Sequence, residues 1–461
     1  TVIHKEYDFP KMKIVINLAP SHIKKRGSHF DLAMAIGLLV QTSQITVKGI
    51  EGYGFIGELS LNGKIRACNG VLPMVIAAKK ANIKSIIVPT DNMEEARLVK
   101  NIDVYGFSDI QDVIDFLEGR NEVSPSTVDN LLDEHQDYQV DFSEVKGQDI
   151  LIDYIVVAAA GGHNMVMIGE PGCGKSMIAS RIPTILPKMG EEESLEVTKI
   201  YSVSGLLRSN SDLMTTRPFR APHHSASLNS LIGGGNFAMP GEVSLAHNGV
   251  LFLDELAEFS KKTLDSLRQP MEDKKVTIAR VNATHVYPAN FMFVAAMNPC
   301  PCGYYGSKKC HCTDYEVQKY RGRISGPILD RIDIQKYVKP VDFFELTNHK
   351  NGRTSRELRE RVEYARAIQR ERYKDIEGIN SNAQMSSALI KKHCGIDEES
   401  RNVLRQASES FGYSARTINK LLRLARTLAD LDGAKDIRKQ DIINVLLARD
   451  LDKDTSRMLT V

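Results

Sequence analysis

Gly169-Glu170-Pro171-Gly172-Cys173-Gly174-Lys175-Ser176 reads GxxxxGKS, the pattern of a phosphate-binding loop, or P-loop. The apolar run over 164–168 predicts a buried strand before it, and residues 177–179 open a helix behind it. Glycines let backbone N–H groups turn toward phosphates at the positive end of that helix. We expect Lys175 to reach the β- and γ-phosphates and Ser176 to hold Mg²⁺. The stretch therefore predicts an α/β domain that binds ATP and Mg²⁺.

A second nucleotide-binding signal follows in Gly249-Val250-Leu251-Phe252-Leu253-Asp254-Glu255. Four apolar residues predict a buried strand whose end presents two carboxylates. Asp254 is expected to bind Mg²⁺ through water, and Glu255 to act as the general base toward the attacking water. The alternative is a strand that merely ends in acidic residues. The P-loop upstream favours the nucleotide interpretation.

A third predicted strand over 291–297 ends at Asn298, whose amide can orient the attacking water. Two arginines, Arg331 and Arg416, are candidates to neutralise transition-state charge on the γ-phosphate, from a neighbouring subunit or as a lid closes. Arg321 and Arg323 compete for this role. The alternative for each arginine is an ordinary surface ion pair.

Four of the seven cysteines lie within thirteen residues, as Cys300-Pro301-Cys302 and Cys310-His311-Cys312. Two CxC pairs joined by a glycine-containing loop can supply four thiolates to one tetrahedral ion, so we predict a structural Zn²⁺. A redox role, reduced cysteines without a metal, and His311 as a substitute ligand remain open. Cys173 lies inside the P-loop, where modification of its thiol could block nucleotide binding.

The chain of 461 residues is long enough for several domains. Residues 1–118 mix predicted strands (13–18, 55–61, 85–88) with helices (30–41, 72–81), and the polar stretch 119–140 is the best linker. A second α/β unit runs over 141–340. Residues 341–461 are helical, with helices predicted over 355–374, 387–394, 398–410, 415–430 and 439–447.

Composition sets few limits on the partners. A net charge of +2 gives no general case for nucleic-acid binding, so any basic surface must be local. No apolar run is long enough to cross a bilayer, which predicts no membrane partner. Clustered cysteines in a chain of this type favour a reducing, cytoplasmic compartment. The start at Thr1, within a strand-like stretch, predicts an N-terminally truncated first domain.

The order of these motifs resembles an AAA+ ATPase, and finer features resemble its magnesium-chelatase-like family, of the ComM/YifB type. These features are Arg217-Pro218-Phe219-Arg220-Ala221-Pro222-His223-His224, Gly233-Gly234-Gly235 and Pro240-Gly241-Glu242-Val243-Ser244-Leu245-Ala246-His247-Asn248-Gly249. The resemblance implies a homo-oligomeric ring, commonly a hexamer, with ATP between subunits. It also implies an insertion over 215–240, a β-hairpin over 274–290 and a C-terminal helical lid.

Residues 1–118 resemble the Lon-protease-like α+β domain that precedes the ATPase in this family. Lon proteases use a Ser-Lys dyad, but His29 falls at the serine position, with Ser28 one place away, and Leu72 falls at the lysine position. Because a one-residue shift misdirects a serine oxygen, we expect no working dyad. The domain is interpreted as a structural or partner-binding module.

The resemblance implies an ATP-driven ring motor acting on single-stranded or branched DNA, as a helicase or branch-migration factor in natural transformation. Lys274, Lys275 and Arg280 of the hairpin could then contact DNA phosphates. The alternative function is a chelatase-like ATPase that remodels a partner protein. A protease-related adaptor is disfavoured by the intact ATPase motifs and the missing dyad.

Overall fold

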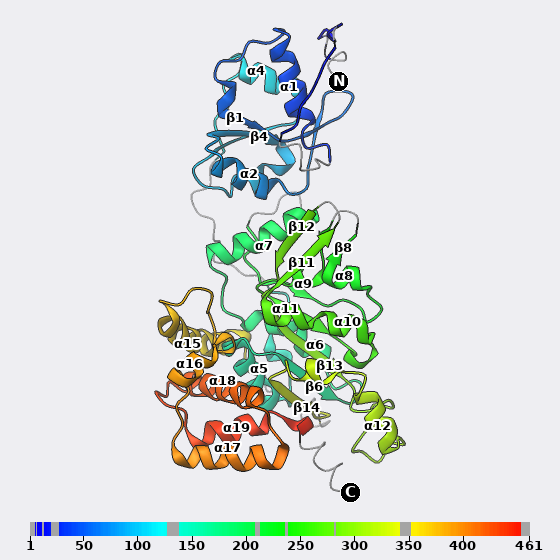
Figure 1. Ribbon diagram of the computed structural model, residues 1–461, viewed down its shortest axis with the longest axis vertical. Helices are drawn as coiled ribbons and strands as arrows, with labels where there is room; N and C mark the ends of the chain where they lie inside the picture. Colours follow the sequence, from blue (N-terminus) through cyan, green and yellow to red (C-terminus); the bar gives the residue numbers. More distant parts are fainter. Residues whose placement is uncertain are drawn as a thin grey trace.

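The computed structural model describes residues 5, 7–11, 13–19, 27–126, 138–207, 213–235, 238–280, 283–341 and 352–452. Three regions follow one another along the chain; the first lies at one end of the long axis, and the other two lie side by side toward the other end (Figure 1). An N-terminal α/β unit is followed by a larger α/β unit and then by a helical region. Residues 127–137 of the predicted linker, and residues 281–282 of the predicted hairpin, lie outside the described residues.

The N-terminal unit is built on a parallel sheet of order β1-β4-β5. Its strands are β1 (Tyr53–Phe55), β4 (Ser85–Pro89) and β5 (Asp103–Phe107), and a short antiparallel pair joins β2 (Glu58–Leu59) to β3 (Ile65–Arg66). Helices α1 (Asp31–Gln41) and α4 (Ile110–Leu117) form one hydrophobic core with the sheet. Helices α2 (Val71–Lys80) and α3 (Met93–Ala96) form another.

Two sequence predictions fail in this unit. The strand predicted over 13–18 is not formed: among the described residues this stretch has no partner strand, and Val15 and Ile16 are 77% and 56% exposed. Apolar alternation alone does not make a strand, because its backbone groups need a neighbour. The strand predicted over 55–61 is divided, since Ile56 and Gly57 lie between β1 and β2.

The larger unit contains a five-stranded parallel sheet of order β14-β6-β13-β10-β7. The strands are β6 (Met165–Gly169), β7 (Phe219–Arg220), β10 (Val250–Leu253), β13 (Met292–Met297) and β14 (Ile334–Val338). Every residue of β6, β10 and β13 is buried, as expected for a parallel sheet covered on both faces. They confirm the prediction that the apolar runs before the P-loop, Asp254 and Asn298 form buried strands.

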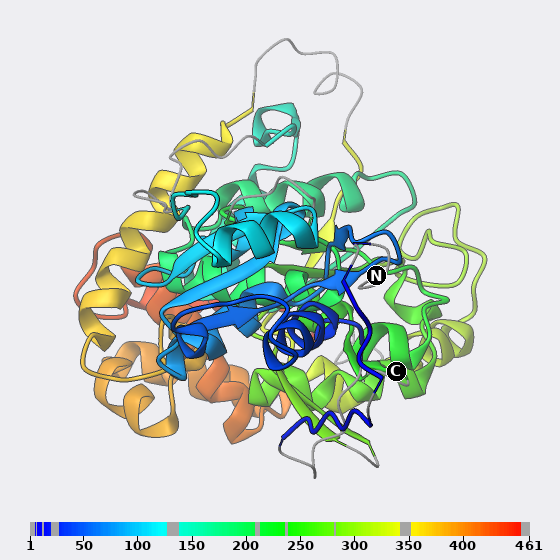
Figure 2. The ribbon, with the colours of Figure 1, turned by 90° about the horizontal axis from the view of Figure 1, so that it is seen from above.

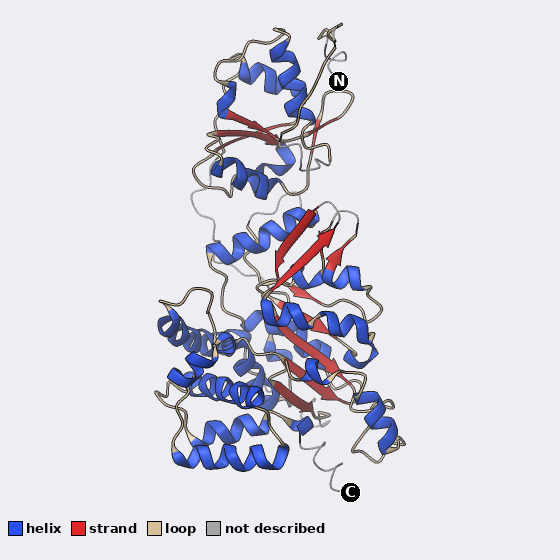
Figure 3. Ribbon diagram, in the orientation of Figure 1, coloured by secondary structure: helices blue, strands red, loops and turns tan. Residues whose placement is uncertain are grey.

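Helices cover both faces of this sheet (Figure 3). They include α5 (Asp149–Gly161), α6 (Lys175–Arg181), α10 (Lys261–Ser266), α12 (Asp314–Arg321) and α13 (Gly326–Leu329). The region between the two nucleotide motifs adds α7 (Glu191–Ser204), α8 (Leu228–Ile232), α9 (Glu242–Leu245) and the pair β8 (Gly233–Gly234) and β9 (Met239–Pro240). The predicted insertion over 215–240 therefore consists of short elements.

The predicted hairpin is formed by β11 (Lys275–Arg280) and β12 (Ala283–Pro288), directly after helix α11 (Arg268–Asp273). Val276 and Ile278 are buried in the core beneath it, whereas Val286 is 58% exposed. The hairpin extends from the sheet toward the side on which the N-terminal unit lies (Figure 1).

The C-terminal region is helical, and its helices agree with the predicted ranges to within one residue. They are α15 (Ser355–Tyr373), α16 (Ser387–His393), α17 (Glu398–Phe411), α18 (Ala415–Leu431) and α19 (Lys439–Leu447). The Ser414 side chain caps α18 by accepting a hydrogen bond from the Thr417 N–H. Helices α15 and α18 share one hydrophobic core with α5, so this region is packed against the larger α/β unit. In the part of the chain that the structure describes, no helix has the length and apolar character needed to span a bilayer.

The N-terminal unit lies over the larger one when seen from above (Figure 2) and contacts helix α7. Buried Glu95 accepts a hydrogen bond from Ser202 Oγ at 2.6 Å and from the Leu72 N–H at 3.3 Å. Leu72 is a fully buried core residue, and Ser28 donates its hydroxyl hydrogen to Glu58. Leu72, at the predicted lysine position, is therefore a packing residue, and Ser28, one place from the predicted serine position, is engaged with a carboxylate.

Candidate active site

The P-loop connects β6 to α6 and leaves its lysine facing inward. Gly172 and Gly174 have φ of +80° and +83°, a conformation that glycine adopts without steric cost. Lys175 Nζ donates to the carbonyl oxygens of Gly169 and Glu170 at 2.8 and 2.9 Å, and lies 3.4 Å from Asn298 Oδ1. The predicted lysine and the predicted asparagine are thus brought together although 123 residues separate them.

Ser176 and Asp254 meet across the top of the sheet. The Ser176 hydroxyl donates to Asp254 Oδ2 at 2.5 Å, and Asp254 Oδ1 accepts the Glu255 N–H at 2.9 Å. Hydroxyl and carboxylate oxygens are the ligands Mg²⁺ prefers. The donor set fits a magnesium ion held with the phosphates of a bound nucleotide.

Glu255 follows Asp254 with a backbone that is uncommon for a residue with a side chain. Its φ is +51°, and such conformations persist where the surrounding structure holds them. Its Oε2 atom lies 3.1 Å from His224 Nδ1, and the His223 ring lies 4.0 Å from the His224 ring. Both histidines line a cavity of about 380 Å³ together with Ser176, Asp254 and Glu255.

His224 was missed as a site residue in the sequence analysis. The sequence around His223 and His224 shows no metal-binding spacing, so the histidine pair by itself did not indicate a site. A usable signal is its place shortly after β7, which pairs with β10, the strand that Asp254 follows. Neighbouring parallel strands bring the residues that follow them to the same edge of the sheet.

Cys173 is buried within the loop. Burial raises the pKa of its thiol, although the nearby Lys175 ammonium acts in the opposite direction. The thiol is therefore protonated at neutral pH and poorly suited to react.

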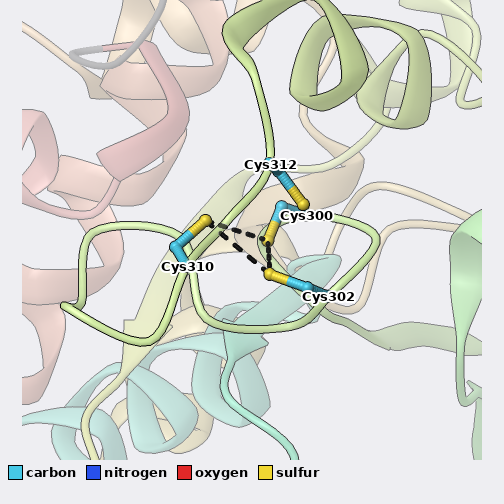
Figure 4. Close-up of side chains that lie close together, drawn as sticks. All are labelled: Cys300, Cys302, Cys310 and Cys312. Carbon is cyan, nitrogen blue, oxygen red and sulfur yellow. Dashed lines mark hydrogen bonds between the residues drawn. The ribbon is translucent and has the colours of Figure 1, made fainter.

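The four clustered cysteines form one compact group at the end of β13 (Figure 4). Their sulfur atoms all lie within 4.8 Å of one another, with Cys300–Cys302, Cys302–Cys310 and Cys300–Cys310 distances of 3.3, 3.7 and 3.9 Å. Sulfurs bound to one tetrahedral zinc lie about 3.8 Å apart, given a Zn–S bond of about 2.3 Å. The cluster fits such an ion.

Two further contacts belong to this cluster. Although desolvation opposes ionisation, backbone N–H groups of Tyr304 and His311 lower the pKa of Cys302 to about 6. Between the two cysteine pairs, Gly303 lies against the P-loop so closely that a Cβ atom there would be 2.8 Å from Pro171. The cysteine loop is therefore in direct contact with the nucleotide loop.

Arg331 and Arg416 lie together, but not at the edge of the sheet where the strands end and the P-loop lies. They lie at the opposite edge, where the parallel strands begin. Both form ion pairs with Glu272, Arg331 at 2.6 Å. Asn164, the residue just before β6, donates its side-chain N–H to the Arg331 carbonyl at 2.8 Å. The P-loop follows the other end of β6, about 15 Å away for a five-residue strand. In this arrangement neither arginine reaches the P-loop of its own chain.

The two arginines line a cavity of about 920 Å³ between the sheet and the helical region. Its basic lining residues are Lys188, Arg217, Lys274, Arg331, Arg366, Arg370, Arg416, Lys420 and Arg423. Its acidic lining residues are Glu191, Glu192, Glu193, Glu272 and Asp333. Basic groups outnumber acidic ones, so the cavity suits an anion.

Several cations of this cavity are desolvated. Burial lowers the pKa of Arg366 to about 10 and lowers the pKa of Lys274 and Lys420. The Nε atoms of Arg331, Arg366 and Arg423 are buried without a hydrogen-bond partner in the described part of the chain. Each of these guanidinium groups still donates through another nitrogen atom, Arg331 to Glu272 and the other two to backbone carbonyl groups. The excess of cations in the lining, and not an unpaired guanidinium, is therefore what suits the cavity to an anion.

The competing arginines lie elsewhere. Arg321 donates to the Pro299 carbonyl at 3.1 Å and to Tyr337, and stacks on Tyr305. Arg323 pairs with Glu258 at 2.9 Å. Neither lines the basic cavity.

Sequence comparisons relate the chain to known proteins. The family profile described as "Magnesium chelatase, subunit ChlI" matches residues 141–346. Profiles of the same subunit match residues 1–92 and, as its C-terminal part, 352–449.

Individual relatives extend over nearly the whole chain. "Competence protein ComM" of Haemophilus influenzae is 37% identical over 451 residues, covering 96% of this chain and 87% of the relative. "Uncharacterized protein YifB" of Escherichia coli is 38% identical over 454 residues, covering 98% and 88%. A "Lon protease" of Leptospira interrogans is 31% identical over 93 residues, or 20% of this chain and 11% of the protease. The chain belongs to the magnesium-chelatase-like family of AAA+ proteins, of the ComM/YifB type, with a Lon-like N-terminal region.

Proposed function

We propose that this chain is an ATP-driven ring motor that acts on single-stranded or branched DNA. The observation that carries the proposal is the separation of two half-sites on one chain. The P-loop, Asp254, Glu255 and Asn298 gather at one edge of the sheet, while Arg331 and Arg416 lie at the other.

Head-to-tail contacts between copies join such half-sites. If the P-loop edge of one subunit faces the basic cavity of the next, the γ-phosphate meets Arg331 and Arg416 of that neighbour. A heterologous contact of this kind closes into a ring when the rotation between copies permits, and we propose a hexamer. The arrangement favours the neighbouring-subunit role of the arginines over closure of the chain's own lid.

Within this site, Lys175 binds the phosphates and Ser176 and Asp254 hold the magnesium ion. Glu255 takes the proton of the attacking water, which Asn298 orients. Bound Mg²⁺ neutralises charge on the phosphates. Glu255 first has to leave His224, so the 3.1 Å contact suits a resting state.

DNA as the substrate is supported by the name of the competence protein, with which the chain shares 37% of its residues. We place the hairpin β11–β12 at the DNA, gripping phosphates electrostatically. Lys275 is exposed on it, whereas Lys274 lines the basic cavity and does not contribute to that grip. The fitting role is a helicase or branch-migration factor in natural transformation, in the cytoplasm.

We also propose that Cys300, Cys302, Cys310 and Cys312 hold a structural Zn²⁺. The ion keeps Gly303 seated on Pro171 and so supports the nucleotide loop. Elemental analysis of the purified chain should find about one zinc per chain. Zinc-free protein that hydrolyses ATP normally would contradict this role.

The experiment for the main proposal measures ATP hydrolysis with and without single-stranded and forked DNA, at low and physiological salt. We expect stimulation by DNA that decreases with salt and is absent in Lys175→Ala. Lys262→Ala, an exposed lysine on α10, is the matched control.

Robust hydrolysis that ignores every DNA tested would favour the second candidate, a chelatase-like ATPase that remodels a partner protein. The match to the magnesium chelatase subunit is the observation behind that candidate. Absence of Lys175-dependent hydrolysis would contradict both candidates.

A further inference from the structure

Glu272 occupies an unusual position between the two arginines. One carboxylate binds two guanidinium groups that come from distant parts of the chain, Arg331 after α13 and Arg416 in α18. Desolvation opposes its ionisation, but the hydrogen bonds from Arg416 and Arg331 lower the pKa of Glu272. The carboxylate is therefore charged, and it is the group that holds the two arginines side by side.

Glu272 is also close to the hairpin along the chain. It lies in the last turn of α11, which ends at Asp273, and β11 begins at Lys275. Lys274 between them has φ +55° and is fixed by two backbone hydrogen bonds, its N–H to Pro270 and its carbonyl to the Ala289 N–H. No free linker separates Glu272 from the base of the hairpin, so a shift of α11 carries the hairpin with it.

The charges at this point make the ion pairs exchangeable. Two guanidinium groups share one carboxylate, which leaves an excess positive charge in a cavity already rich in cations. A terminal phosphate offers more negative charge and more acceptor oxygens than a carboxylate, and it suits the planar donors of arginine. A phosphate entering the cavity therefore competes with Glu272 for both arginines.

We propose that Glu272 is a positioning residue that relays the presence of ATP in the neighbouring subunit to the β11–β12 hairpin. Without phosphate in the cavity, Glu272 holds Arg331 and Arg416 and keeps α11 against them. When the neighbour's γ-phosphate binds the arginines, Glu272 is released and α11 moves with the hairpin. This inference rests on the proposed ring and adds the link between its ATP site and its substrate-contacting element.

The test measures hydrogen exchange of residues 275–288 in the assembled protein, with and without a non-hydrolysable ATP analogue and Mg²⁺. In the wild type we expect the analogue to change deuterium uptake there. In Glu272→Gln without nucleotide, uptake should already be at the level that the analogue produces in the wild type. The amide keeps the shape of the side chain but lacks the charge that holds two guanidinium groups.

The matched control is Glu399→Gln, which removes an exposed ion pair with Lys439 far along the helical region. This variant should behave as the wild type. A second readout is the ratio of ATP hydrolysis with DNA to hydrolysis without it, which should fall to about 1 in Glu272→Gln while nucleotide-free thermal stability stays near that of the control.

Two results would overturn the relay. One is a wild-type hairpin whose exchange is unaffected by the analogue, and the other is a Glu272→Gln variant that responds as fully as the wild type. Either can occur while Arg331→Ala and Arg416→Ala still abolish hydrolysis, in which case the ring proposal stands and the relay alone fails. Retained hydrolysis in both arginine variants would instead contradict the ring proposal.

Discussion

The two edges of the ATPase sheet differ in how their polar groups are satisfied. At the edge where strands end, Lys175, Ser176, Asp254 and Asn298 contact one another or nearby carbonyl groups over 2.5 to 3.4 Å. At the edge where strands begin, desolvated cations line a cavity of about 920 Å³, and three buried Nε atoms lack a partner among the described residues. The first edge satisfies these polar groups within one chain, whereas the second presents an excess of cations to its cavity.

This difference shows why a nucleotide-binding motif does not define a whole active site. The P-loop edge can bind ATP with groups from one chain. The arginine edge is turned away from it, and in the proposed ring it receives the triphosphate that a second copy holds. The following predictions test this division of labour.

The largest expected effect comes from inactivating one edge in one subunit and the other edge in a second subunit. Arg416→Ala and Lys175→Ala should each lower ATP hydrolysis by about 1000-fold, because each lacks one half of the site. Mixing the two inactive variants should restore activity, since about one quarter of interfaces in a random ring join an intact P-loop to an intact arginine. The measurement is the steady-state ATPase rate of the mixture after subunit exchange.

If Arg416 served the P-loop of its own chain, no combination of these two variants would contain a complete site. A mixture as inactive as its components, despite proven subunit exchange, would therefore contradict the proposal that Arg416 serves the P-loop of a neighbouring subunit. Mixing Arg416→Ala with Arg331→Ala is the control, because it leaves no interface with both arginines.

The next effect concerns the acid that balances the cationic edge. Asp333 lies just before β14, where desolvation opposes its ionisation but a hydrogen bond from His163, the charge of Lys420 and the Asn164 N–H lower its pKa to about 2. An acid with a lowered folded-state pKa stabilises the fold above its unfolded value near pH 4 and loses that contribution as the pH falls toward 2. We expect Asp333→Asn to reduce the free energy of unfolding by about 2 kcal/mol at pH 7 and by progressively less below pH 4.

Chemical denaturation at several pH values measures this difference. Asp436→Asn, at an exposed position in the helical region, should leave stability unchanged. Equal losses at pH 7 and pH 2.5 would mean that the Asp333 charge does not stabilise the cationic edge.

The smallest effect sharpens the description of the P-loop edge. Gly303 and Gly306 have φ of +87° and +89°, so an alanine strains the backbone similarly at either place. Only at Gly303 would the added methyl group meet Pro171, at 2.8 Å, while nothing lies within 4 Å at Gly306. We expect Gly303→Ala to weaken ATP binding by about tenfold relative to Gly306→Ala.

Equilibrium binding of a fluorescent ATP analogue to the two variants provides the comparison. Equal affinities would show that the cysteine loop and the P-loop are energetically independent, despite their contact.

Much of the fold could be predicted from local sequence patterns. Apolar runs before the P-loop, Asp254 and Asn298 became β6, β10 and β13, since a strand buried on both faces must be apolar throughout. The helices after residue 354 were readable from their periodicity and from a cap such as Ser414. The stretch 13–18 misled the same reasoning, because pairing with another strand is not a local property.

The sequence by itself determined the family, the kind of fold and the residues of the P-loop edge, because these depend on short motifs and on burial patterns along the chain. Only the tertiary structure brought His224 to Glu255 and joined Arg331 to Arg416 through Glu272. The contact between Glu272 and Arg416 unites residues 144 positions apart in the chain. Such contacts follow from strand order and helix packing, which bring together side chains whose spacing in the sequence carries no chemical pattern.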